Sequence, residues 1–156
     1  MLAGVGFSAQ GKFEGSYYRR TAESRAPDLA WMFEGIEDQE ILGDFGFSGG
    51  GAAGFELDRA DVRLGTPKEV RVVASSENHT SSFVLVPEEM LTHITNWPGE
   101  EEQQKLIRSD IVYFRTPSGG EVFSTGSITF CGSLPWNDFD NNISRLLENV
   151  IRRFLQ

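Results

Sequence analysis

The chain has 156 residues, enough for one domain with a sizeable core, and its formal net charge of −9 argues against an electrostatic nucleic-acid partner. Its single cysteine, Cys131, excludes an internal disulfide and a cysteine-based zinc site, and no apolar run approaches the roughly 20 residues of a membrane span. Because the N-terminus has no basic, signal-like segment, we expect a soluble cytoplasmic protein that binds neither nucleic acid nor membrane.

The first two thirds of the chain carry short apolar segments separated by polar ones, without a regular alternation of strands and helices. β-Branched residues bounded by turn residues predict strands, and an acidic start favours a helix N-terminus. The expected elements are strands over 2–7, 40–45, 69–75 and 82–86, a buried strand or helical turn over 29–33, a loop over 11–27, and helices over 87–91 and 100–107.

The last third has the clearest pattern. Residues 111–115 and 121–130 flank the turn segment Thr116–Gly120, which predicts a β-hairpin. A helix follows, with its cap among residues 140–142 and with apolar residues at helical spacing. That apolar face consists of Ile143, Leu146, Leu147, Val150, Ile151, Phe154 and Leu155. We interpret this amphipathic terminal helix as packing rather than chemistry.

Five glycines lie within residues 46–54, and charged residues follow at once. The block contains G-x-G-x-x-G, which binds dinucleotides when a strand precedes it and a helix follows. Residues 55–58 alternate apolar and acidic side chains instead, which favours a strand. The sequence therefore predicts a tightly packed turn rather than a nucleotide fingerprint.

Glu56, Asp58 and Arg59 are the first candidates for chemistry. On a strand the two carboxylates share a face, where they could share a proton, hold a metal, or act as acid and base. Arg59 could clamp one of them or a substrate oxygen. The alternative is a structural ion-pair network after a tight turn, and the sequence leaves both open.

Four other groups stand out. His79 follows a strand end, a frequent place for catalytic groups, but the sequence favours the alternative of an exposed loop histidine. His93 has no acidic or cysteine partner nearby, which favours a structural role. The adjacent Tyr17 and Tyr18 are interpreted as packing or interface residues rather than metal ligands. Cys131 lacks a nucleophile-elbow pattern and is interpreted as a small buried hydrophobe.

Several segments together resemble one family, the C-terminal part of the large (β) subunit of N,N-dimethylformamidase and its relatives. The resemblance spans nearly the whole chain. It rests on residues 5–11, 16–20, 49–59, 64–67 and 123–134 and on the asparagines after Asp140. It implies an α/β fold, part of a class I glutamine-amidotransferase-like three-layer domain. It also implies an amidohydrolase that cleaves N-substituted formamides to formate and an amine, with an iron held by two tyrosines and a glutamate.

The resemblance further implies that these iron ligands lie upstream of the matched part, so no metal ligand is assigned to this chain. Glu56 is the position it suggests for an acid–base group outside the metal shell, and Asp58, Arg59 and His79 are kept as candidate site residues. Residues 1–156 are expected to form a single domain, the C-terminal segment of a larger catalytic domain. The expected partners are a small-molecule amide, further copies of the chain and a small partner subunit. The alternative function is a non-catalytic binding or assembly module on the same scaffold.

Overall fold

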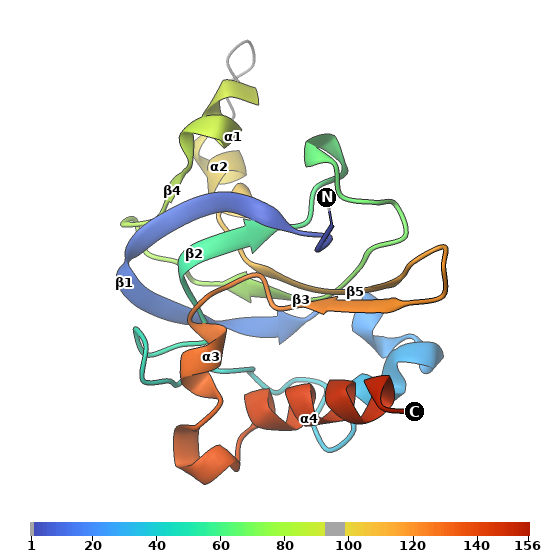
Figure 1. Cartoon of the computed structure of the whole chain (residues 1–156). Coiled ribbons are helices and arrows are strands. Elements are labelled where there is room, and N and C mark those ends of the chain that lie inside the picture. The colour runs from blue at the N-terminus through green and yellow to red at the C-terminus, as the bar shows by residue number, and fades with distance from the viewer. Residues whose placement is uncertain (1, 93–98) are drawn as a thin grey trace.

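A curved antiparallel sheet lies at the centre of the protein (Figure 1). The computed structural model describes residues 2–92 and 99–156. The strands are β1 (Gly6–Arg20), β2 (Ala53–Arg59), β3 (Arg71–Glu77), β4 (Val84–Leu85), β5 (Asp110–Arg115) and β6 (Glu121–Ser124). They follow the order β2-β1-β3-β5-β6, and β4 pairs with β1. Every one of these pairings is antiparallel. A glutamine-amidotransferase-like three-layer domain stays a prediction, because the pairings within this chain do not test it.

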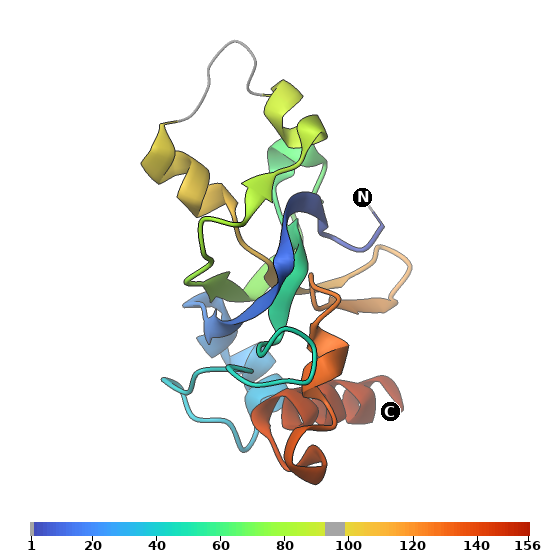
Figure 2. The ribbon, with the colours of Figure 1, turned by 90° about the vertical axis from the view of Figure 1, so that its left-hand side faces the viewer.

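The helices and 3₁₀ turns lie at the two ends of the sheet. The helices are α1 (Pro87–Thr92), α2 (Glu100–Leu106), α3 (Phe130–Ser133) and α4 (Asn142–Phe154), and the 3₁₀ turns are η1 (Glu23–Arg25), η2 (Pro27–Phe33), η3 (Val62–Leu64) and η4 (Trp136–Phe139). Figure 2 shows α1 and α2 at one end of the molecule and α3 and α4 at the other, with the sheet between them. Within the described residues, no helix is long and apolar enough to cross a membrane.

Strand β1 is long and bent, and it joins the two halves of the sheet. Its first part pairs with β2 and β4, whereas Tyr17 to Arg20 pair with β3. The register against β2 shifts between Gln10 and Gly15, and such a bulge bends a strand. The predicted loop over 11–27 is therefore wrong as far as Arg20. Ladder hydrogen bonds to partner strands hold Gly15 to Arg20 in the sheet, although the glycines, lysine and glutamate of residues 11–20 are types depleted in strands.

The predicted hairpin is confirmed, but its second strand is shorter than expected. Val112 pairs with Ser124 and Arg115 with Glu121, so β5 and β6 flank the predicted turn. The strand predicted to run to residue 130 ends at Ser124 instead, because Gly126 adopts a φ of +67° and turns the chain toward α3. Residues after this turn thus leave the sheet.

Helix α4 confirms the predicted amphipathic terminal helix. Asn141 is its N-cap, and its side chain accepts a hydrogen bond from the Ser144 amide. The buried side chains are Ile143, Leu146 and Val150, and the Asn149 side chain donates to two carbonyls at the end of η2. The predicted apolar face is wrong in its last turns, where Ile151, Phe154 and Leu155 are exposed.

The remaining predictions vary in accuracy. The strands over 69–75 and 82–86 and the helices over 87–91 and 100–107 are confirmed as β3, β4, α1 and α2 with shifted ends. Residues 29–33 were predicted to form a buried strand or a helical turn, and they belong to the 3₁₀ turn η2. In place of a strand over 40–45, the structure has an isolated bridge between Leu42 and Tyr18.

The main core lies between the sheet and the layer formed by η2, α3 and α4. It contains Tyr18, Leu29, Met32, Phe33, Ile36, Leu42, Ala52, Ala53, Val73, Ala74, Ile111, Tyr113, Phe130, Ile143, Leu146 and Val150. A smaller cluster of Ala9, Leu57, Phe83 and Leu85 lies against the end of α2. Ala53 belongs to the main core and Leu57 to the smaller one, so both cores hold β2, the strand that carries the candidate carboxylates.

Candidate functional site

The glycine-rich segment packs its backbone directly onto β1. The Gly15 amide donates to the Gly49 carbonyl over 2.7 Å, and a Cβ atom at Gly51 or Gly54 would collide with β1 backbone atoms. Strand β2 follows this segment. A dinucleotide fingerprint needs a helix there, so the structure agrees with the prediction of a close-packed turn.

Glu56 and Asp58 lie on the same face of β2 and line one pocket of about 460 Å³, as the alternation predicts. We call it the carboxylate pocket. Both side chains are half-buried. Burial raises the pKa of Asp58, and the charge of the neighbouring Glu56 raises it further. The other lining residues are Ala3, Val5, Phe123, Ser124, Thr125, Gly126, Ser127, Ile128 and Leu147.

The opposite wall of the carboxylate pocket is the turn between β6 and α3. The Asp58 amide donates to the Gly126 carbonyl over 2.8 Å. The Ser127 hydroxyl donates to the Gly54 carbonyl and accepts from the Gly54 amide, each over 2.8 Å. The sequence pattern does not connect this turn with Glu56 and Asp58, because residues 125–127 are some 70 positions from β2 and carry no charge.

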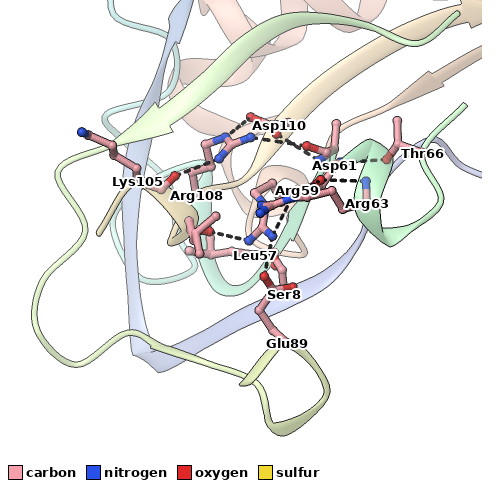
Figure 3. Close-up of polar contacts among 12 residues, drawn as sticks. Ser8, Leu57, Arg59, Asp61, Arg63, Thr66, Glu89, Lys105, Arg108 and Asp110 are labelled. Atoms are coloured by element: carbon pink, nitrogen blue, oxygen red, sulfur yellow. Dashed lines mark hydrogen bonds and ion pairs between the residues drawn. The ribbon is translucent and has the colours of Figure 1, made fainter. Parts of the chain in front are cut away.

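Arg59 faces the opposite side of β2 and is fully buried. Its Nη2 atom donates to Glu89 on α1 over 2.7 Å and to Asp61 over 3.1 Å, and Nη1 donates to the Leu106 carbonyl at the end of α2 over 2.9 Å (Figure 3). Arg59 clamps neither Glu56 nor Asp58, because strand alternation sends its side chain away from them. Its partners form the structural ion-pair network that was the alternative to a catalytic role. Through them Arg59 ties α1 and α2 to β2.

Further charged groups surround this buried arginine. Asp61 accepts hydrogen bonds from the Arg63 amide and guanidinium, which hold the pKa of Asp61 well below its usual range. Asp110, fully buried at the start of β5, accepts from Arg108 (Figure 3). It also accepts from the Ser75 hydroxyl and the Ala60 amide. Sequence reasoning missed Asp110. An acidic residue directly before the apolar run Ile111–Phe114 was the signal that could have found it.

His79 lies elsewhere, in a pocket of about 820 Å³ that shares no lining residue with the carboxylate pocket. Its Nε2 atom is 2.6 Å from Ser76 Oγ, and its ring packs on Phe83 with centroids 4.7 Å apart. Burial lowers the pKa of His79 to about 4, so the imidazole is neutral at pH 7. The other lining residues are Ser76, Glu77, Asn78, Thr80, Ser81, Phe83, Glu100, Glu101, Gln104, Lys105, Ile107 and Arg108.

The four candidate residues therefore lie at three places, and only Glu56 and Asp58 come together. Cys131, in α3, is exposed, so the buried position predicted for it is wrong. His93 falls outside the described residues.

The iron implied by the resemblance has no fitting ligand set in the described part of the chain. Tyr17 and Tyr18 are neighbours on β1, and strand alternation sends their side chains to opposite faces. The Tyr18 hydroxyl is buried and hydrogen-bonded to Ser109 and Thr125, and burial raises its pKa, which disfavours a tyrosinate ligand. Among the described residues, no group of three or more histidines, cysteines and carboxylates is arranged to hold a metal ion.

The chain matches a family model described as N,N-dimethylformamidase beta subunit-like, C-terminal, over residues 1–142. It therefore belongs to this family, and the resemblance predicted from its motifs is confirmed. Its relatives include the N,N-dimethylformamidase beta subunits of an Alcaligenes species and of Paracoccus aminophilus. Each is 40% identical to it over 153 residues, which is 98% of this chain. The chain spans 20% of the length of each of these relatives.

Proposed function

We propose that this chain is part of an amidohydrolase that cleaves N-substituted formamides, such as N,N-dimethylformamide, to formate and an amine. The observation that carries this proposal is the 40% identity over 98% of the chain to two proteins named N,N-dimethylformamidase beta subunit. Because these relatives are named as subunits, we propose that the protein works in an assembly, with further copies of the chain and a smaller partner subunit.

The carboxylate pocket supports the proposal chemically. Hydrolysis of an amide needs a group that takes a proton from the attacking water and one that returns a proton to the departing amine nitrogen. Glu56 and Asp58 line the same pocket and have no ion-pair partner among the described residues. Burial and the negative charge of Glu56 already move the pKa of Asp58 upward, toward the range useful in proton transfer. We assign the proton transfers to this pair.

The iron implied by the resemblance is proposed to be held by residues outside this chain, since the described residues offer no ligand set for it. We assign no part of the metal's chemistry to the carboxylate pocket. Its side chains would bind and orient the amide and handle protons.

The test is formate release from N,N-dimethylformamide by the protein purified at its native length from its source. Release of formate and dimethylamine in equal amounts is expected. No release under conditions where a known dimethylformamidase works would contradict the proposal and favour a non-catalytic binding or assembly module. Iron analysis of the same sample tests the proposed cofactor, and absence of iron from an active sample would overturn that part.

A further inference from the structure

A line of hydrogen bonds runs through the interior of the protein, from the His79 pocket to the carboxylate pocket. Tyr18 is fully buried, and its hydroxyl donates to the Thr125 carbonyl over 2.8 Å. The Ser109 hydroxyl lies 2.9 Å from the same tyrosine oxygen. The Ser109 amide donates to Ser76 Oγ over 2.7 Å, and His79 Nε2 lies 2.6 Å from that oxygen. The line thus begins at His79 and ends at the turn that walls the carboxylate pocket.

On its other side the turn is held by β2, through the hydrogen bonds between Ser127 and Gly54 and the bridge between Ser127 and Leu57. Residues 125–127 follow the end of β6, outside the β5–β6 ladder. A Cβ atom at Gly126 would lie 2.6 Å from Ser109 Oγ and 2.9 Å from the Asp58 carbonyl, so the turn is wedged between Ser109 and β2. The Gly126 carbonyl also receives the Asp58 amide hydrogen bond. A shift of Thr125 would therefore reach the backbone of Asp58 directly.

We propose that Tyr18 is a positioning residue for the carboxylate pocket, whose hydroxyl, together with Ser109, fixes the turn that holds Asp58. The effect of Tyr18 on catalysis rests on the proposed function, whereas its effect on the position of the turn is independent of that function. A phenylalanine would fill the same apolar space, so the hydroxyl is present for its two hydrogen bonds. Burial raises the pKa of Tyr18, and the hydroxyl therefore remains a donor to Thr125 throughout the neutral range.

The chain offers a matched control in the adjacent tyrosine. Tyr17 lies on the other face of β1, and the Arg19 guanidinium lies 5.6 Å from its ring centroid. Tyr18→Phe and Tyr17→Phe each remove one hydroxyl from the same strand. A difference between the two variants therefore reports the Tyr18 hydrogen bonds.

The first readout is amide hydrogen exchange of this chain, followed by NMR. In Tyr18→Phe the Asp58 amide is expected to exchange about ten-fold faster relative to the amides of the β3–β5 ladder, since one net hydrogen bond is worth about that factor. Tyr17→Phe should leave the ratio unchanged. If Tyr18→Phe accelerates both sets of amides equally, the role of Tyr18 is merely structural and the proposal is overturned. If Tyr18→Phe changes neither set, the proposal is overturned as well.

The second readout is formate release by the protein at its native length. Tyr18→Phe is expected to lower kcat about ten-fold with little change in KM, because it displaces the proton-transfer groups rather than the substrate contacts. An unchanged kcat would overturn the catalytic relevance of the positioning. If the wild type releases no formate at all, the proposed function fails, and the exchange experiment still decides whether Tyr18 positions the turn.

Discussion

Replacing Arg59 with methionine tests the buried charge network most severely. The Arg59 side chain is fully buried, and the Glu89 side chain at 2.7 Å is only 2% exposed. Removal of one partner from a buried ion pair typically costs about 3–5 kcal/mol, because the other charge is left in a poorly solvating place. A domain of this size has a total stability of roughly 5–15 kcal/mol, so much of it would be lost.

The assay is a urea titration followed by tryptophan fluorescence. With a slope near 2 kcal/mol per M, the expected loss moves the midpoint of Arg59→Met down by about 2 M. Arg152→Met is the matched control, because Arg152 pairs with Glu148 at the surface and is 72% exposed. Surface pairs contribute about 0–1 kcal/mol, so this control should move the midpoint by less than about 0.5 M.

A second variant separates the loss of the pair from the cost of leaving the Glu89 charge buried without Arg59. Arg59→Met combined with Glu89→Met replaces both charges with apolar groups and should recover much of the loss. The reasoning is refuted if Arg59→Met shifts the midpoint no more than Arg152→Met. It is refuted equally if the double variant is no more stable than the single one.

Three further predictions concern the rest of the molecule. Because the pKa of His79 is about 4 in the folded protein against 6.5 for the free side chain, its contribution to stability is present above pH 6.5 and is lost as the pH falls toward 4. Between pH 7 and pH 4, the free energy of unfolding from urea titrations should fall by up to about 3 kcal/mol less in His79→Gln than in the wild type. An equal fall in both proteins would show that His79 does not cause this pH dependence. Gly54→Ala, which places a Cβ atom against a β1 carbonyl, should cost about 1–3 kcal/mol in thermal melts, and an unchanged melting temperature would argue against this close packing. Asn141→Ala removes the N-cap of α4 and should cost about 1 kcal/mol, and an unchanged melting temperature would argue against the cap.

Local pattern predicted those elements whose stability is mostly local. The hairpin of β5 and β6 and helix α4 follow from a turn sequence, a cap and a clear periodicity. The alternation of Glu56 and Asp58 likewise predicted their shared face. Strand β1 was missed between residues 11 and 20, because its extended form depends on pairing with residues 37 or more positions later in the chain.

Periodicity could say which way a side chain points, but not what it meets there. Arg59 was grouped with its sequence neighbours, yet it pairs with Glu89, 30 residues away on α1. Tyr18 was interpreted as a packing residue, and the partners of its hydroxyl lie 91 and 107 positions further along the chain. These contacts are set by the fold as a whole, which is why the far wall of the carboxylate pocket was missed.

The central claim is that Glu56 and Asp58 move protons in the hydrolysis of an N-substituted formamide. The most direct measurement is kcat for formate release by the native-length protein carrying Glu56→Gln, compared with Glu102→Gln, which changes an exposed carboxylate on α2. We predict that kcat falls about 10²–10⁴-fold in Glu56→Gln, the usual contribution of general acid–base catalysis, and stays at the wild-type value in Glu102→Gln. Equal kcat values for the two variants would contradict the account.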